Sequence, residues 1–369
     1  MSYFNSVYAG KTVLITGHTG FKGSWLSLWL SKLGAKVYGL ALDPYSDLSN
    51  YNASKLSECL NEDLRVDVTD SEAVCEIIER IKPDFVFHLA AQALVKLSYA
   101  EPVPTMLTNA IGSANVLEAL RRSNANATVM MITSDKCYDN VEWVWGYRET
   151  DRLGGKDPYS ASKAMAELAI RSFVDSFFRG RDCNTRVGIA RAGNVIGGGD
   201  WALDRIVPDC MNAWSKGKIV AIRSPEATRP WQHVLEPLSG YLHQAARLHE
   251  ADELHGEAYN FGPPAGQDYT VRQLIDQMGK YWEKIRWEDV SESGKHQPEA
   301  GLLRLNCDKA QNDLRWEPTM NFSETVEMTV DWYRTFYQNS GQNMRAKSDS
   351  QIEHYMQIAD TRGRIWLGQ

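Results

Sequence analysis

The chain has 369 residues, of which 43% are hydrophobic and 24% charged, a balance typical of globular proteins and unlike disordered or collagen-like chains. Its net charge of −7 argues against general binding of nucleic-acid backbones. The six cysteines form no Cys-x-x-Cys pair, and no cluster of ligating residues stands out, so we expect neither a disulfide framework nor a metal. Because neither a signal segment nor a run of about 18 apolar residues is seen, we expect a cytoplasmic protein without a membrane partner.

Short strand-like runs alternate with helical stretches through the first two-thirds of the chain. Strands are expected at 12–16, 36–42, 84–89, 128–133 and 185–191, and helices at 24–33, 73–81, 103–122 and 159–178. Strict alternation of strand and helix requires crossover connections, which are right-handed in nearly all proteins. The sequence therefore predicts an α/β fold with a Rossmann-type, doubly wound parallel sheet.

Beyond residue 199 the segments become shorter and the loops richer in proline. A late strand at 257–261 is expected to rejoin the first sheet, so the second lobe would be interleaved with the first. We predict a Rossmann domain formed by 1–198 and about 232–263. A smaller substrate-binding lobe would comprise 199–231 and 264–369.

A glycine-rich turn follows the first strand and opens the first helix. It has the spacing G-x-x-G-x-x-G and consists of Gly17, His18, Thr19, Gly20, Phe21, Lys22 and Gly23. Glycines at such a turn let the backbone approach a pyrophosphate, which free N–H groups at a helix N-terminus favour. The turn therefore predicts a bound dinucleotide, and a plain strand-to-helix turn is the alternative.

Acidic residues further along bear on which dinucleotide would bind. Asp43 lies about twenty residues beyond the turn, where an acid can bind the adenosine ribose and favour NAD over NADP. A solvated acid before Pro44 is the equal alternative. Asp67 and Val68, after the next expected strand, are candidates for contacts with the adenine.

Tyr159 and Lys163 are four residues apart at the start of an expected helix, so their side chains share one face. Oxidation of a sugar alcohol needs a base for the hydroxyl proton as hydride leaves the carbon. Free tyrosine, with a pKa of about 10, is a poor base at neutral pH. A neighbouring ammonium group stabilises the phenolate, so the pair predicts an alcohol-oxidising site. A solvated helix face is the alternative.

Several further segments resemble the extended short-chain dehydrogenase/reductase family. The run after the fourth expected strand resembles the family's cofactor-lining segment, the next helix resembles its cofactor asparagine region, and Thr133 precedes its catalytic motif. Ser134-Asp135-Lys136 narrows the resemblance, because relatives acting on dTDP-glucose usually carry Thr-Asp-Glu there. Lysine at the third position is similar to the CDP-glucose 4,6-dehydratases. The cofactor-lining residues of this resemblance are Leu89, Ala90, Ala91, Gln92, Asn109 and Thr133.

The resemblance implies a hydro-lyase that binds NAD and converts CDP-D-glucose to CDP-4-keto-6-deoxy-D-glucose and water, for deoxysugar biosynthesis of the O-antigen type. It implies that Tyr159, with Lys163 and Ser134, takes the carbon-4 hydroxyl proton. Asp135 would be the acid at carbon 6 and Lys136 the base at carbon 5. Because consecutive strand side chains face opposite ways, Asp135 and Lys136 can share a site only if the strand ends near Ser134.

The resemblance also supplies candidates for substrate contacts and a mode of assembly. Asn194 would orient the diphosphate, Arg229 and Arg205 would bind phosphate, and Trp201 and Trp231 would flank the base or sugar. Pairing of the 103–122 and 159–178 helices between subunits would give a homodimer or a dimer of dimers.

Three alternatives remain open at this stage. The first is dehydration of dTDP-glucose or another nucleotide-glucose. The second is a nucleotide-sugar 4-epimerase, which has no elimination step and so does not require the Asp135–Lys136 pair. The third is a non-catalytic dinucleotide sensor, which would retain the turn at Gly17 without needing Tyr159 and Lys163.

Overall fold

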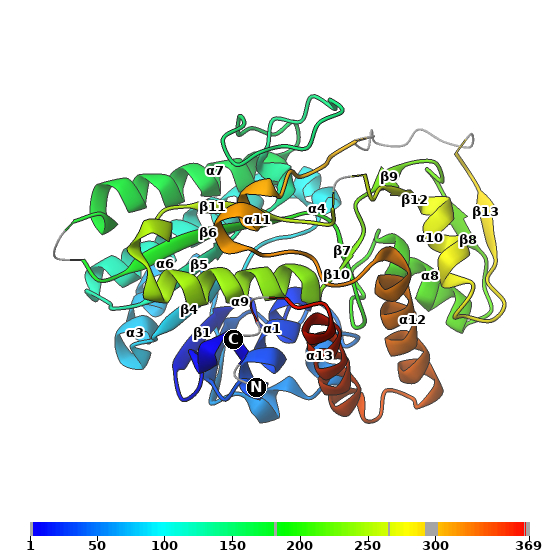
Figure 1. Cartoon of the computed structure of the whole chain (residues 1–369), viewed down its shortest axis with the longest axis horizontal. Coiled ribbons are helices and arrows are strands. Elements are labelled where there is room, and N and C mark those ends of the chain that lie inside the picture. The colour runs from blue at the N-terminus through cyan, green and yellow to red at the C-terminus, as the bar shows by residue number, and fades with distance from the viewer. Residues whose placement is uncertain (1–2, 181–182, 265, 292–301, 365, 367–369) are drawn as a thin grey trace.

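The computed structural model describes residues 3–180, 183–264, 266–291, 302–364 and 366 (Figure 1). Seven parallel strands form the central sheet, in the order β11-β6-β5-β4-β1-β2-β3. The predicted Rossmann-type α/β sheet is thus confirmed, including the late strand, which pairs with β6 from Ala258↔Ile189 to Phe261↔Ala192. The strands are β1 Thr12–Thr16, β2 Lys36–Ala41, β3 Glu62–Arg65, β4 Phe85–His88, β5 Thr128–Ile132, β6 Arg186–Ala192 and β11 Ala258–Phe261.

Helices cover both faces of this sheet, and alternate strand residues feed two separate cores. Val13 and Ile15 of β1 pack with helices α1 (Phe21–Lys32) and α9 (Leu235–Glu250). Leu14, between them, faces the opposite core, which is built by the three helices described next. Burial of both faces explains why these strands are almost continuously apolar. The helices on that second face are α3 (Ser71–Ile81), α6 (Gly112–Arg122) and α7 (Pro158–Phe173).

Two long helices depart from the regular α-helices predicted for 103–122 and 159–178. The first consists of three consecutive parts, which are α5 (Pro102–Met106), a π-helical turn at Leu107–Ile111, and α6. The second is α7 followed by a π-helical turn at Val174–Phe178. A π-turn inserts one extra residue into a helix and is common at functional sites. The short helix α4 (Val95–Ala100), which precedes α5, was not predicted.

The smaller lobe lies at the carboxyl ends of the sheet strands, on the right of Figure 1. Two short parallel pairs help to build it, β7 with β10 and β8 with β13, together with the antiparallel pair β9 with β12. The short strands are β7 Val195–Ile196, β8 Val220–Ile222, β9 Thr228–Arg229, β10 Gln232–His233, β12 Tyr269–Thr270 and β13 Trp287–Asp289. The helices are α8 Ile206–Ser215, α10 Val271–Met278 and α12 Phe322–Gln338.

Two C-terminal helices pack back against the Rossmann part of the chain. Helix α11 (Asp308–Leu314) contacts β11 at the sheet edge, and α13 (Met344–Thr361) packs between α1 and α12 (Figure 1). The boundaries 1–198, 232–263, 199–231 and 264–369 remain a prediction. Within the described ranges, no helix combines the length and apolar character needed to cross a membrane.

Candidate active site

A cavity of about 1700 Å³ lies between the carboxyl ends of the strands and the smaller lobe. Such crevices at the ends of parallel strands are where open α/β sheets bind ligands. The predicted residues that line it are Gly17, Thr19, Gly20, Phe21, Lys22, Gly23, Asp43, Asp67, Val68, Leu89, Ala90, Ala91, Thr133, Ser134, Asp135, Lys136, Tyr159, Lys163, Asn194, Arg205, Arg229 and Trp231.

The glycine-rich turn fits a dinucleotide pyrophosphate. Gly17 has φ +78°, and a Cβ built there would lie 2.7 Å from the Ala90 backbone nitrogen. A Cβ on Gly23 would lie 2.1 Å from the Gly17 carbonyl oxygen. The turn and the start of α1 can therefore pack this closely only because glycine occupies both positions. Gly20 caps α1 with no side-chain partner, which leaves the N–H groups of the first helical turn facing the cavity.

Helix α7 brings Tyr159 and Lys163 to the opposite wall of the cavity. Asp157 caps the helix by accepting a hydrogen bond from the Ser160 backbone nitrogen at 2.9 Å, and Pro158 occupies the first helical position. Burial raises the pKa of Tyr159 to about 12, although a hydrogen bond with Ser134 opposes the shift. Burial lowers the pKa of Lys163 to about 8. The phenol is therefore protonated at neutral pH unless a nearby positive charge stabilises the phenolate.

The predicted catalytic motif, Ser134-Asp135-Lys136, forms a tight turn directly after β5. The strand ends at Ile132, and Asp135–Cys137 form one turn of 3₁₀ helix that packs against α7. Both Asp135 and Lys136 line the cavity, so the geometric condition for their sharing one site is met. Ser134 caps the turn: its hydroxyl donates to Asp135 Oδ1 at 2.9 Å and accepts from the Lys136 backbone nitrogen at 3.3 Å.

A fully buried ion pair supports this turn and was not among the predicted site residues. Arg191 donates from Nε and Nη2 to the two carboxylate oxygens of Glu167, at 2.7 and 2.8 Å. The Thr133 hydroxyl donates to Glu167 Oε1 at 2.6 Å, and Arg191 Nη1 donates to the Tyr138 hydroxyl at 2.7 Å. Glu167 therefore joins α7, β6 and the end of β5. The spacing of Tyr159, Lys163 and Glu167, each four residues from the next, could have revealed it.

Lys22, in the glycine-rich turn, lies within electrostatic range of Asp135 in the predicted catalytic motif. Its Nζ lies 3.4 Å from the Tyr241 hydroxyl, to which it donates. Burial lowers the pKa of Lys22 to about 8, and the Asp135 carboxylate partly opposes this shift. The turn thus contributes a cationic side chain close to Asp135 as well as backbone donors.

Four predicted site residues do not line the cavity. His18 is fully buried beneath the turn and hydrogen-bonds to Asp63 Oδ1 at 2.7 Å. Asn109 lies in the π-turn, where its Oδ1 accepts from the Gln92 backbone nitrogen at 2.8 Å and its Nδ2 donates to Ser162 Oγ at 2.8 Å. These two bonds make Asn109 and Gln92 supports of the cavity wall.

Trp201 is the fourth of these residues. Its ring packs in an aromatic cluster with Trp332, Tyr333 and Phe336, at centroid distances of 5.5, 5.7 and 4.7 Å. Contact with α12 therefore places Trp201 behind the cavity wall. The prediction that it flanks the base or sugar of a ligand does not match this position.

The remaining substrate candidates line the part of the cavity nearer the smaller lobe. Arg205, just before α8, donates from Nη1 to Asp200 Oδ2 at 2.7 Å. Trp231 is buried and donates from its indole nitrogen to the Tyr269 carbonyl at 3.1 Å. Asn194 and Arg229 lie on the same side. Sequence reasoning did not single out the apolar part of this wall, formed by Val207, Pro208, Val220 and Ile222.

Comparison with known proteins identifies the family. The profile of the family described as GDP-mannose 4,6 dehydratase matches residues 14–329. The chain belongs to this dehydratase family. One relative is the CDP-glucose 4,6-dehydratase of Salmonella typhimurium, which is 44% identical over 95% of this chain and 97% of the relative's chain. The resemblance predicted from the motifs is thereby confirmed.

More distant members of the dehydratase family and solved structures agree with the fold. A dTDP-glucose 4,6-dehydratase of Xanthomonas campestris is 25% identical, over 88% of this chain and 93% of its own. The structure of DesIV, a dTDP-glucose 4,6-dehydratase from Streptomyces venezuelae with NAD and TYD bound, matches with a TM-score of 0.70 and 21% identity, over 88% and 97% of the chains. A UDP-glucose-4-epimerase from Stenotrophomonas maltophila, with NAD bound, matches with a TM-score of 0.75 and 18% identity, over 89% and 99%.

Proposed function

We propose that this protein is an NAD-dependent CDP-glucose 4,6-dehydratase, a hydro-lyase that converts CDP-D-glucose to CDP-4-keto-6-deoxy-D-glucose and water. The observation that carries the proposal is the meeting of two pairs in one cavity, Tyr159 with Lys163 and Asp135 with Lys136. The first pair suits alcohol oxidation, and the second suits elimination of water. The 44% identity to a CDP-glucose 4,6-dehydratase over nearly the full chain supports CDP-glucose over dTDP-glucose as substrate.

The chain's own residues fit NAD at the glycine-rich turn. The backbone of Gly17 to Gly23 would hold the pyrophosphate, Asp43 the adenosine ribose, and Asp67 and Val68 the adenine. Lys163 would hold the nicotinamide ribose. When bound, NAD supplies an acceptor that takes a hydride from the sugar and later returns it.

The residues around the sugar would each move one proton. Tyr159 takes the carbon-4 hydroxyl proton, stabilised as phenolate by the Lys163 ammonium and by its position in the first turn of α7. Lys136 takes the carbon-5 proton, which the new carbon-4 ketone has made acidic, and returns it to carbon 5 at the end. Asp135 protonates the carbon-6 hydroxyl, which leaves as water.

The proton balance of the reaction indicates a role for Ser134 in proton transfer. After one turnover Tyr159 has gained a proton from the substrate and Asp135 has lost one to water, so a proton must pass between them. The Ser134 hydroxyl has a hydrogen bond with Tyr159 and donates to Asp135 Oδ1 at 2.9 Å. Ser134 thus bridges donor and acceptor and can relay the proton that resets the site.

The substrate's other groups would lie toward the smaller lobe. Arg205 and Arg229 would bind the diphosphate, Asn194 would orient it, and Trp231 would pack against the base or sugar. All four line this cavity, which supports the arrangement. Deoxysugar synthesis of the O-antigen type, in the cytoplasm, is the setting that the proposal predicts.

We also infer a homodimer, or a dimer of dimers, that pairs α5–α6 and α7 with their copies. Val103, Leu107 and Ile111 recur every fourth residue and are exposed, with Val103 62% accessible. Met165 and Leu168 of α7 are exposed as well, although Ile170 belongs to the internal core. Exposed apolar residues at helical spacing on two adjacent helices are typical of a helix-packing interface.

The test is incubation of the purified protein with CDP-, dTDP-, UDP- and GDP-linked sugars, each with and without added NAD. A 4-keto-6-deoxy product absorbs in alkali, so the proposal expects absorbance with CDP-glucose above the other substrates. Formation of CDP-galactose without that absorbance would indicate a 4-epimerase instead. Binding of NAD with no conversion of any sugar would favour a dinucleotide sensor.

A further inference from the structure

A charged cluster lies where β2 and β3 end, beside the glycine-rich turn. Arg65, the last residue of β3, donates from Nε to Asp43 Oδ1 at 2.8 Å. Its Nη1 donates to Asp63 Oδ1 and lies 3.3 Å from His18 Nε2. Its Nη2 donates to the Tyr51 hydroxyl at 2.8 Å and to Asp63 Oδ2 at 3.2 Å. All three guanidinium nitrogens therefore have partners within the protein.

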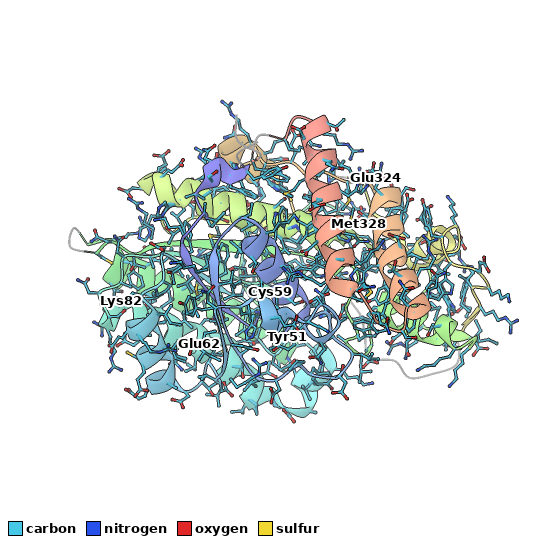
Figure 2. All side chains as sticks on the ribbon, turned by 90° about the horizontal axis from the view of Figure 1, so that it is seen from below. Tyr51, Cys59, Glu62, Lys82, Glu324 and Met328 are labelled. Atoms are coloured by element: carbon cyan, nitrogen blue, oxygen red, sulfur yellow. The ribbon has the colours of Figure 1, made fainter. Side chains whose placement is uncertain are left out.

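Tyr51 comes from the segment that connects β2 with β3. It lies in the short helix α2 (Asn50–Ala53); Figure 2 labels it and Glu62, the first residue of β3. The guanidinium carbon of Arg65 lies 5.2 Å from the centre of the Tyr51 ring, a cation–π distance. The Tyr51 hydroxyl also donates to Asp63. This segment therefore fixes the direction in which Arg65 points.

The cluster sits where a dinucleotide's adenosine ribose would lie. Asp43 follows β2 and lines the cavity, while 86% of its side chain is accessible. In Rossmann folds an acid at this place binds the ribose 2′-hydroxyl, and a nearby arginine accommodates the 2′-phosphate of NADP. This chain has both residues, and they are bonded to each other.

The charge of the cluster disfavours a phosphate. Burial lowers the pKa of His18, so the ring is neutral at pH 7, and the single charge of Arg65 faces two carboxylates, Asp43 and Asp63. A 2′-phosphate would bring further negative charge to a site whose arginine is already occupied. Loss of the Asp43 charge would leave the Arg65–Asp63 pair neutral and would remove the charged partner of Arg65 Nε.

We propose that the Arg65–Asp43 ion pair sets the preference for NAD over NADP, with Arg65 a masked 2′-phosphate site that Asp43 keeps closed. Asp43 binds the 2′-hydroxyl and Arg65 orients Asp43, while Tyr51 orients Arg65. The inference rests on the proposed dinucleotide site. It adds that removal of one carboxylate converts an NAD site into one that accepts NADP.

The experiment measures binding of NAD, NADP and 2′,5′-ADP to the full-length protein by titration calorimetry, so that no turnover is needed. D43N should weaken NAD binding about tenfold and tighten NADP and 2′,5′-ADP binding about 10- to 100-fold, the range expected for one hydrogen-bonded charge. D43N/R65M should lose the gain for the two phosphate-bearing ligands, because the guanidinium is absent. R65M alone should weaken NAD binding by releasing Asp43.

Each outcome has one meaning. If the parent binds NAD and D43N leaves the NADP-to-NAD ratio unchanged, the masked site does not exist. If D43N/R65M retains the gain, another residue binds the phosphate and the assignment to Arg65 is wrong. If the parent protein binds neither dinucleotide, the proposed function itself fails. Asp43 is accessible and outside the core, so D43N should fold, and an unchanged melting temperature checks this.

Discussion

The buried ion pair between Glu167 and Arg191 yields the sharpest prediction about stability. Replacement of Glu167 by glutamine keeps the size and shape of the side chain but removes its charge. Arg191 would then lose its ion-pair partner while staying fully buried, since both side chains have 0% accessibility. The hydrogen bond from Thr133 at 2.6 Å would weaken as well.

The structure sets the size of the effect. Removing one partner of a buried ion pair typically costs about 3–5 kcal/mol, because the other charge remains desolvated. The chain also contains a matched pair with the same geometry at the surface, Glu118 and Arg121. There Arg121 donates from Nε and Nη2 to the two carboxylate oxygens, both at 2.7 Å, but the side chains are 35% and 42% accessible. We expect E118Q to cost only about 0.2–1 kcal/mol.

Urea unfolding of the parent, E167Q and E118Q, followed by circular dichroism, measures both values. A difference between the two variants of less than about 1 kcal/mol, with equal m-values, would show that burial does not govern this pair. Burial alone would raise the pKa of Glu167, but the charge and hydrogen bonds of Arg191 lower it below its usual range. The ionised Glu167 therefore stabilises the protein above the pKa that it has in the unfolded chain. This stabilisation is lost as pH falls through the lower pKa that it has in the folded protein. The difference in unfolding free energy between the parent and E167Q should therefore become smaller in acid.

Four further predictions concern catalysis and assembly. K136M should lower the rate of formation of the 4-keto-6-deoxy product at least about 100-fold and abolish exchange of the carbon-5 hydrogen with deuterated water. An undiminished rate of product formation would refute Lys136 as the base. S134A should complete a first turnover in a rapid-quench experiment and then slow down, whereas equal slowing of the first and later turnovers would argue against the relay. Because burial lowers the pKa of Lys163 to about 8, kcat/KM should fall as pH rises through that value and the charge is lost. K163R, which keeps its charge, should lack this alkaline fall, and an unchanged profile would contradict the role of the ammonium. L168E should convert the inferred dimer to monomers in light scattering, while the exposed control Q338E should not. A dimeric L168E would place the interface elsewhere.

Most of the fold could be predicted because its signals are local. The alternation of strand and helix and the glycines after β1 lie within short stretches of sequence, and the sheet confirms them. The π-turns could not be predicted, because the extra residue is accommodated by tertiary contacts such as those of Asn109 with Gln92 and Ser162. Tyr51 was not among the predicted site residues, because its contact with Arg65 of β3 exists only in the folded chain.

The site was predicted less completely than the fold. Motifs brought together the catalytic candidates, whose roles await the experiments above. The spacing of Glu167 from Lys163 places it on the same helix face as the predicted catalytic residues, but its pairing with Arg191 depends on strand β6 and is seen only in the three-dimensional fold. Trp201 was predicted to contact a ligand, but its ring packs against α12 instead. Its neighbours there are more than a hundred residues away along the chain, so the sequence near Trp201 does not indicate which way the ring faces.

The strand that completes the sheet has a consequence for synthesis of the protein. Residues Ala258–Phe261 occupy the edge beside β6, so a nascent chain emerging from the ribosome exposes the unpaired backbone of Arg186–Ala192 until some seventy further residues have been translated. An open, apolar strand edge is a template for aggregation. Chaperone demand should therefore peak while this part of the chain is being made, and fragments that stop before residue 258 should be the ones that precipitate.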